Sequence, residues 1–474
     1  MLNHGINAKK AETNFVEANE IRVGIPFFIG AWPCHTAGGY TGKPQLIRTY
    51  AEAVAAGGYS DDWKDASKNP KWTLCEAVFS HFKVFGQSPA VFFNVFDPAT
   101  NKSAVTAADK SVTDHCVKLP DEAIIDSGLV VKDDDTTLVL GTDYEAAYDG
   151  GYLVITLKAG SHYSATTLNI AYNTIDLSGI TATTITTAIE KVEGCKSLLG
   201  LVPDLICIPG WSQTPAVAAV MATKAASING MYRAKAVVDL DTSASGADTY
   251  EDVATYKTAN GYTDENMIVC WPLVTLDSKV FDFSVIMCGL IAQTDAENDG
   301  IPSASPSNRD LPIDGCVNKA GAEITLNVDH ADVVSYTDGV VTALNFDGWK
   351  SWGNYTAVGP TESDVAKKFI CTNRMHDFIC NVFVDMFWSY LDRPLTRVLI
   401  DAIVNEFNSY LTALTASGDL CGGEIAFVDT NNPADDLLAG KFRLDTKMAS
   451  PVPAQQINMV AEFDVDILVG AFNV

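Results

Sequence analysis

The feature that most constrains this chain is a strict alternation of side chains near its C-terminal end. One set points to one side and is largely apolar, and its members are Ile457, Met459, Ala461, Phe463, Val465 and Ile467. The residues between them are mostly polar or acidic. A period of two over this length predicts a β-strand with one buried face. Pro451-Val452-Pro453 comes just before it and favours an extended lead-in.

A strand of this length must pair with the edge of a sheet, because an apolar strand with unpaired backbone groups promotes aggregation. The pattern leaves two partners open: a sheet of the same chain, or the sheet edge of a neighbouring subunit, reached by strand addition. We therefore expect residues 455–474 to form a C-terminal arm strand. Residues 1–20 are polar and have little to pack, so we expect an N-terminal arm there.

Composition describes a folded protein of several domains rather than a disordered one. The chain has 474 residues, of which 47% are hydrophobic and 19% charged. Its net charge of −27 argues against a general nucleic-acid binder, since phosphate backbones require clustered cations. No apolar run is long enough to predict membrane insertion, and we expect no signal peptide. The eleven cysteines are scattered without a C-x-x-C pair, which favours buried thiols in a reducing cytoplasm.

The middle of the chain alternates between strand and helix signals. Strands are predicted at 205–208, 234–238 and 267–274, with helices at 215–228 and 250–259 between them. Strands joined by helices at this spacing predict a parallel α/β sheet. We assign residues 191–345 to this central domain, with residues 21–98 as its first part.

Residues 99–190 differ from the segments on either side. They are rich in Thr, Asp and Gly, and short strand signals recur at 138–140, 152–157 and 167–172. This spacing predicts a small all-β, sandwich-like module inserted into the α/β domain. The fold class expected for the whole chain is therefore multidomain, with α/β and α+β parts.

Residues 346–454 are predicted to form a C-terminal α+β domain. Apolar residues recur at helical spacing from about 361 to 390, and Arg393-Pro394 ends that run. A second amphipathic helix follows to about 416. Two strands are expected after it, near 424–429 and 441–448.

Motifs for catalysis are weak. Gly210-Trp211-Ser212 stands between a predicted strand and a helix, which is the setting of a nucleophile elbow, but the second glycine is missing and no histidine partner can be assigned. Ser212 is better interpreted as a cap of the helix that begins near Pro215. Gly42-Lys43 does not belong to a phosphate loop, because Ala37 stands where that motif requires glycine and Pro44 where it requires serine or threonine. We expect no enzyme, no metal and no cofactor.

Several motifs, in order along nearly the whole chain, resemble one family. They are His4-Gly5, Val23-Gly24-Ile25-Pro26, Gly42-Lys43-Pro44-Gln45-Leu46-Ile47, Phe96-Asp97-Pro98, Gly141-Thr142-Asp143-Tyr144, Tyr148-Asp149-Gly150-Gly151, Pro215-Ala216-Val217-Ala218, Ser305-Pro306-Ser307-Asn308-Arg309, Trp352-Gly353-Asn354-Tyr355-Thr356, Asp392-Arg393-Pro394 and Cys421-Gly422-Gly423. Together they resemble the contractile tail sheath proteins of bacteriophages and phage-tail-like injection systems.

The resemblance implies a central domain with a subtilisin-like fold but no protease function. It also implies that the arms add strands to a small sheet in adjacent subunits, so that a homo-oligomeric helical sheath surrounds an inner tube. Expected partners are the tube, baseplate and tail-terminator proteins. Assembly would take place in the bacterial cytoplasm, before release of a virion or tail-like particle.

The C-terminal domain of the family faces the tube, and the basic residues near its helices are therefore candidates for that contact. They are Lys367, Lys368, Arg374, Arg393 and Arg397. They are mixed with acidic residues and form no clear basic stripe. Two other classes of protein remain open: an α/β hydrolase or protease that uses Ser212, and a non-contractile shell or surface-layer protein.

Overall fold

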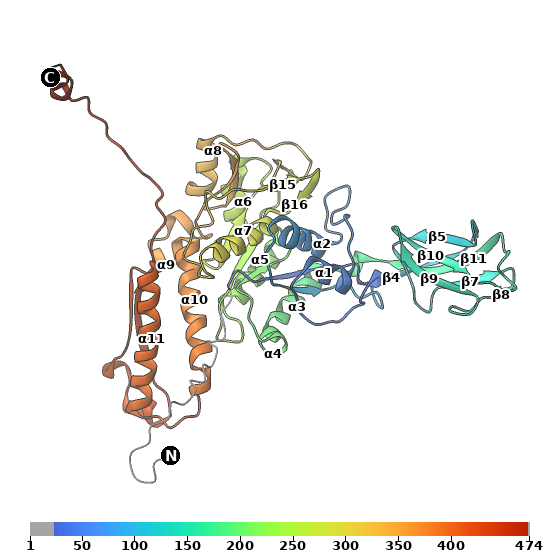
Figure 1. Ribbon diagram of the computed structural model, residues 1–474, viewed down its shortest axis with the longest axis horizontal. Helices are drawn as coiled ribbons and strands as arrows, with labels where there is room; N and C mark the ends of the chain where they lie inside the picture. Colours follow the sequence, from blue (N-terminus) through green and yellow to red (C-terminus); the bar gives the residue numbers. More distant parts are fainter. Residues whose placement is uncertain (1–22, 473–474) are drawn as a thin grey trace, which may run out of the picture.

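The computed structural model describes residues 23–472, and its centre is a six-stranded sheet (Figure 1). The strand order is β14–β13–β12–β1–β3–β2, with five parallel strands and β2 antiparallel at one edge. The strands are β1 (Pro26–Gly30), β2 (Gln45–Ile47), β3 (Ala90–Asn94), β12 (Leu205–Cys207), β13 (Lys235–Asp239) and β14 (Met267–Cys270). The predicted parallel sheet is thereby confirmed.

Helices cover the central sheet. Every residue of the five parallel strands is buried, as expected when both faces of a parallel sheet are covered. Helix α7 packs on β12, β13 and β14, whereas α3 and α5 pack on each other and on the sheet. The helices of this region are α1 (Tyr50–Gly57), α2 (Thr73–Val78), α3 (Ala182–Ile189), α4 (Cys195–Leu199), α5 (Pro215–Ala226), α6 (Val253–Ala259), α7 (Phe283–Glu297) and α8 (Val328–Asp332).

The segment between β3 and α3 forms β-sheets of its own and projects from the body of the molecule (Figure 1). One sheet has the order β5–β10–β9, and the other contains β4, β11, β7, β8 and β6. The strands are β4 (Lys102–Ser111), β5 (Cys116–Pro120), β6 (Ala123–Ile124), β7 (Val130–Asp133), β8 (Thr136–Thr137), β9 (Tyr144–Asp149), β10 (Tyr152–Leu157) and β11 (Thr167–Ile175). Val117, Leu153 and Ile170 belong to its separate apolar core. The strand predicted at 138–140 is wrong, because only Leu140 there forms a single β-bridge.

Two long antiparallel helices and a hairpin follow in the C-terminal part. Helix α10 (Ile370–Phe387) comes after the short α9 (Val365–Lys368), and α11 (Arg397–Ser417) packs on α10 through an apolar cluster. Thr396 caps α11 by accepting the amide N–H of Leu399, and Gly418 ends it in a left-handed conformation. Strands β20 (Gly422–Phe427) and β21 (Leu444–Ala449) form a two-stranded sheet against α11, with α12 (Ala434–Leu438) in the connection. These helices and strands confirm the elements predicted here.

Smaller sheets complete the fold. Strands β15 (Leu273–Leu276), β16 (Lys279–Phe281) and β17 (Gly315–Val317) form one of them, and β18 (Thr342–Asn345) pairs with β19 (Trp349–Trp352). Within residues 23–472, no helix has the length and apolar character needed to cross a membrane.

The C-terminal arm differs from its prediction. After β21 the chain extends away from the body without pairing to any described strand, and it ends in the short helix α13 (Val465–Gly470) (Figure 1). Asp464 starts this helix by accepting the amide N–H groups of Asp466 and Ile467. The expected strand is therefore not formed among the described residues of this chain.

Candidate functional sites: the α10 joint and the C-terminal arm

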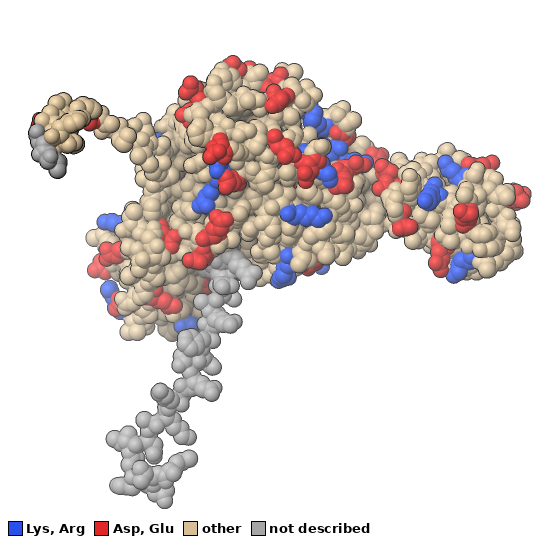
Figure 2. Space-filling model, turned by 45° about the horizontal axis from the view of Figure 1, so that its top comes forward, with Lys and Arg blue, Asp and Glu red and all other residues tan. Residues whose placement is uncertain are grey.

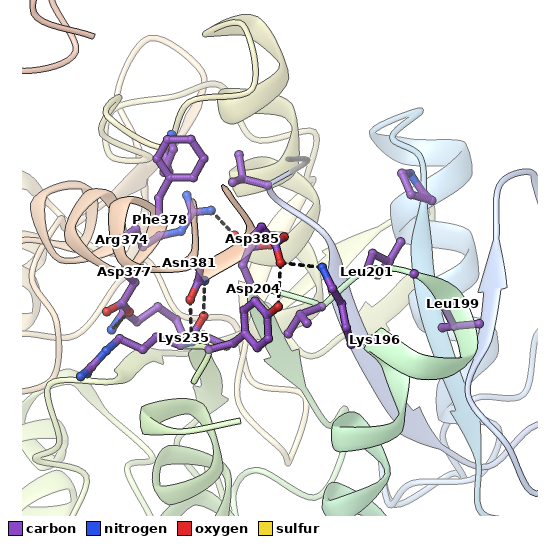
Figure 3. A pocket seen from close by; sticks show the side chains of 18 of the residues that line it. Lys196, Leu199, Leu201, Asp204, Lys235, Arg374, Asp377, Phe378, Asn381 and Asp385 are labelled. Carbon is purple, nitrogen blue, oxygen red and sulfur yellow. Dashed lines mark hydrogen bonds and ion pairs between the residues drawn. The ribbon is translucent and has the colours of Figure 1, made fainter. Parts of the chain in front are cut away.

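Helix α10 has two faces of opposite character. Its apolar face, with residues such as Ile379 and Val382, packs on Phe407 and Leu411 of α11. Its other face carries polar residues at spacings of three and four, which place them on one side of a helix. They are Arg374, Asp377, Asn381 and Asp385, and we name them the polar stripe of α10 (Figure 3). This stripe faces the central domain.

Arg374 makes the most deeply buried contacts of the polar stripe. Its side chain is 4% exposed, and its guanidinium donates to both carboxylate oxygens of Asp295 in α7 at 2.8 and 2.6 Å. It also donates to Asp204 at 2.8 Å, just before β12. Burial disfavours the charged guanidinium, but the two carboxylates outweigh burial and raise the pKa of Arg374. The sequence prediction that Arg374 faces the tube is wrong, since this side chain lies inside the subunit.

The other stripe residues also bind the central domain. Asp377 lies 2.6 Å from the Nζ of Lys235, the first residue of β13, and Lys235 also donates to Asn266 at 2.9 Å. Lys235 is buried, and burial lowers its pKa. The hydrogen bond to Asn266 and the ion pair with Asp377 limit the free-energy cost of burying this amine.

The end of the stripe is fixed in the same way (Figure 3). Asp385 accepts from the Nζ of Lys196 and the hydroxyl of Tyr232, both at 2.6 Å. Asn381 accepts the backbone N–H of Arg233 at 2.9 Å and donates to its carbonyl at 2.8 Å. Because Asn381 binds both backbone groups of one residue, these two hydrogen bonds form only when α10 has this position along the central domain.

A cavity of about 320 Å3 lies along the polar stripe, between α10 and the central domain. Its wall combines apolar residues with a set of charged side chains, which are Arg48, Lys196, Asp204, Arg233, Lys235, Arg374, Asp377 and Asp385. The pairs described above hold most of these groups against each other. This arrangement suits a joint whose geometry depends on ion pairs in addition to apolar packing.

Ser212, for which catalysis was considered, lies between β12 and α5, beside the carboxyl end of β13. Ser212 is buried; its hydroxyl donates to Asp239 at 3.1 Å and accepts the Asp239 backbone N–H at 3.0 Å. Its predicted capping role is wrong, since Thr214 occupies the N-cap position of α5 and its side chain makes no capping bond. No histidine contacts Ser212 among residues 23–472, so the geometry of a nucleophile elbow is not formed there.

Buried acids accompany Ser212. Burial raises the pKa of Asp239 to about 7, although two serines donate to it. Glu76 and Asp282 share the ammonium group of the buried Lys64. Within the described part of the chain, no cluster of three or more His, Cys, Asp and Glu side chains has the arrangement of a metal site.

The remaining tube-facing candidates do not lie together. Lys367 is near the start of α10, where it pairs with Glu265 at 2.8 Å, and Lys368 lies over the ring of Tyr355. Arg393 and Arg397 lie about one helix length away, at the turn between α10 and α11. On the face shown in Figure 2, basic and acidic side chains are intermixed.

Sequence reasoning missed an apolar patch at the same turn. Trp388, Leu391 and Val398 expose more than half of their side-chain surface beside Arg393 and Arg397. Exposed Trp beside Arg is typical of contact surfaces. The signal was present in the sequence as Trp388-Ser389-Tyr390-Leu391 between two amphipathic helices.

The C-terminal arm exposes its apolar residues. Ile457 is 89% exposed and Phe463 75%, and Met459, Val465 and Ile467 are likewise exposed. The arm is attached at its root, where Gln455 accepts from the hydroxyl of Tyr355 at 3.0 Å. The N-terminal residues His4 and Gly5 lie outside the described residues.

Comparison with known proteins points to one family. No protein family model matches the chain. The tail sheath protein of Burkholderia phage BcepMu is 24% identical over 413 residues, which cover 81% of this chain and 83% of that protein. The tail sheath protein of Escherichia phage P2 is 24% identical over 276 residues, or 56% of this chain and 64% of that protein.

Solved structures share the fold. The contracted sheath complex of an extracellular contractile injection system, PVC, matches with a TM-score of 0.59 and 13% identity, over 98% of this chain and 99% of that chain. A chain of the anti-feeding prophage baseplate gives the same TM-score and identity over 98% and 100%. A sheath tail protein from Desulfitobacterium hafniense matches with a TM-score of 0.52 and 13% identity, over 88% and 90%.

The sequence relatives cover most of the chain and the structures cover nearly all of it. The resemblance found in the sequence is therefore confirmed, and this chain is a relative of the contractile tail sheath proteins.

Proposed function

We propose that this chain is the structural subunit of a tail sheath, which polymerises helically around an inner tube and contracts to drive the tube through a target cell envelope. The observation that carries the proposal is the C-terminal arm, whose apolar side chains find no partner among the described residues of their own chain. Exposed apolar surface of this extent marks an interaction site. The contracted state of the PVC sheath structure supports the choice of a contractile assembly.

The arm joins neighbouring subunits by strand addition. Its alternating residues pair with the open edge of a small sheet in the neighbouring subunit and bury one face there, whereas in the single chain the arm extends away from the body without pairing. The β20–β21 hairpin of the neighbour is the acceptor. Asn408 of α11 binds the backbone N–H and carbonyl of Ile425, which occupies the edge of β20, whereas β21 pairs only with β20 among the described strands.

An apolar groove beside β21 supports this acceptor. It has a volume of about 420 Å3 and is lined mainly by α10, α11 and the hairpin, through residues that include Phe383, Phe407, Ile425, Leu444 and Met448. A two-stranded hairpin is marginally stable without further strands. An added arm strand would extend the sheet and cover part of this groove. His4 and Gly5 in the N-terminal arm, residues 1–20, take part in the same linkage.

The turn between α10 and α11 faces the inner tube. Arg393, Arg397 and the exposed Trp388, Leu391 and Val398 supply the contact, with Lys367 and Lys368 at its far margin. The same proposal includes the domain limits given from the sequence. It takes the central domain as subtilisin-like and the insert at 99–190 as sandwich-like. The subunit has no catalytic role, assembles in the bacterial cytoplasm, and meets baseplate and tail-terminator proteins at the sheath ends.

Electron microscopy tests the proposal. The full chain, mixed with the tube protein encoded beside it, is expected to form hollow striated cylinders, and the chain without residues 455–474 is not. The deletion leaves the thermal midpoint of the subunit unchanged, because the arm packs on little of its own chain. A full chain that stays monomeric with and without tube would overturn the sheath proposal, and flat sheets or closed shells would favour a surface-layer protein.

A matched pair of variants isolates the arm face. Ile457→Ser with Phe463→Ser removes apolar side chains from one face, and cylinders are expected to be lost. Asn458→Ser with Glu462→Ser changes the other face by the same number of residues, and cylinders are expected to persist. Long ordered sheaths from the chain without residues 455–474 would show that the arm does not join the subunits. Hydrolase activity lost on Ser212→Ala would restore the enzyme alternative.

A further inference from the structure

The carboxylate of Asp204 is a meeting point for three parts of the chain. Its oxygens accept the backbone N–H of Gly24 at 3.1 Å and of Ile25 at 2.7 Å, where the N-terminal segment enters β1. The same carboxylate accepts from the guanidinium of Arg374 in α10. Asp204 itself leads into β12 of the central sheet. One side chain therefore binds the root of the N-terminal segment to the first long helix of the C-terminal part.

The root of the N-terminal segment is held closely at this point. Gly24 has a φ of +70°, and a Cβ there would lie 2.9 Å from the Cα of Ala292 and 3.0 Å from Asp295. Only glycine fits this backbone conformation in that space. Asp295 is the second partner of Arg374, so the guanidinium and the backbone of Gly24 share the same two acidic neighbours.

The C-terminal arm is connected to the same point through packing. Arg374 lies in α10, α10 packs on α11, and α11 packs on the β20–β21 hairpin from which the arm departs. The α10–α11 contact is apolar and closely packed, whereas α10 meets the central domain through its polar stripe and a cavity as well as through the apolar residues Ile370 and Val384. Polar interfaces of this kind permit relative motion of domains unless specific contacts prevent it.

We infer that Arg374 is a positioning residue that fixes the root of the N-terminal segment and the α10–α11 hairpin to each other. The N-terminal segment at Gly24 and the β20–β21 hairpin, from which the C-terminal arm departs, then keep one relative orientation when the subunit moves within the sheath. A planar guanidinium with three donor contacts to two carboxylates constrains direction as well as distance, which a lysine ammonium does not. The consequence for the arms rests on the proposed function, whereas the coupling itself is a property of the single subunit.

The test is a distance measurement between spin labels by pulsed electron paramagnetic resonance on the isolated subunit. Labels are placed at T223C in α5 and S409C in α11, both exposed, in a background with C116S, C380S and C421S. The otherwise unchanged chain is expected to give one narrow distance distribution. R374M/D295N removes the guanidinium together with its main buried counter-charge, and is expected to broaden the distribution by about twofold or more. R374K is expected to give an intermediate width.

A second Arg–carboxylate pair provides the control. R309M/E297Q removes the partly exposed pair of Arg309 and Glu297, whose atoms lie 3.0 Å apart, and the distribution is expected to stay narrow. Distributions of R374M/D295N as narrow as those of the parent would overturn the inference. If R374M/D295N does not fold, the same comparison with R374K decides. A subunit that forms no cylinders would contradict the sheath proposal without altering this result.

Discussion

The central sheet and the C-terminal arm use similar side chains and end in opposite environments. In β3, the run Ala90-Val91-Phe92-Phe93-Asn94 is fully buried between layers of helices. In the arm, Ile457 and Phe463 are largely exposed. The difference lies in where the partner is: the sheet finds its cover within the chain, and the arm does not. An apolar pattern thus predicts that a surface will be buried, but it does not identify the part of the same chain, or the neighbouring subunit, that buries it.

The largest expected effect comes from the sheet side of this comparison. Phe28 in β1 has no exposed surface, and its ring centre lies 5.4 Å from that of Phe92. Phe28→Ala removes buried contacts and leaves a cavity, which lowers the free energy of unfolding by about 3–5 kcal/mol. Urea unfolding of the monomer, followed by circular dichroism, measures this loss.

Phe28→Leu is the control for this substitution. It retains most of the buried volume, and we expect a smaller loss than for Phe28→Ala. A change of less than about 0.5 kcal/mol for Phe28→Ala, as is usual at surface positions, would contradict the buried position of β1.

The sequence predicted the sheet well because its strands are continuous apolar runs between helices. Leu205–Cys207 and Lys235–Asp239 were found within one or two residues. The arm was predicted as a strand because a period of two records an alternation of faces and gives no information on the partner. Without a partner, the segment from Val465 follows the local capping signal of Asp464 and becomes helical.

The joint of α10 was missed for a related reason. An amphipathic pattern identifies the apolar face of a helix, and its polar face is normally assumed to meet solvent. Arg374 was therefore assigned to the tube, and no partner within the chain was predicted for Asp377, Asn381 or Asp385. Their spacing on one face with both signs of charge was visible in the sequence, but their partners at 204, 235 and 295 are distant along the chain and depend on the tertiary fold.

The second prediction concerns Asp239 at the end of β13, an ionisable side chain buried in the otherwise mostly apolar central sheet. Its pKa in the folded protein is raised to about 7, first by burial and then by the nearby Asp282. The folded state therefore binds this proton more tightly than the unfolded state does. As pH rises from the unfolded pKa toward 7, this group makes folding less favourable, and the full cost is present above 7.

Asp239→Asn tests this linkage, because the amide cannot ionise. The free energy of unfolding of wild type relative to Asp239→Asn should fall as pH rises from 4 to 8, by about 1.4 kcal/mol for each unit by which the pKa is raised. Urea unfolding of both proteins at a series of pH values gives this difference in the free energy of unfolding. Groups that titrate alike in both proteins cancel from the difference. A difference that stays nearly constant over this pH range would show that the carboxyl of Asp239 is not perturbed in the folded protein.

The smallest expected effect on stability is in the arm, where the same substitution as in β1 tests the difference between a buried and an exposed phenylalanine. Phe463→Ala removes the same atoms as Phe28→Ala, but 75% of the Phe463 side chain already faces solvent. In the monomer, its free energy of unfolding should therefore change by less than about 0.5 kcal/mol. Under assembly conditions the same substitution should raise the protein concentration needed to form cylinders, since the ring is buried only when a neighbour receives the arm. Light scattering over a concentration series measures this threshold. A loss of monomer stability as large as that of Phe28→Ala would place the arm against its own subunit, whereas an unchanged threshold would remove Phe463 from the contact between subunits.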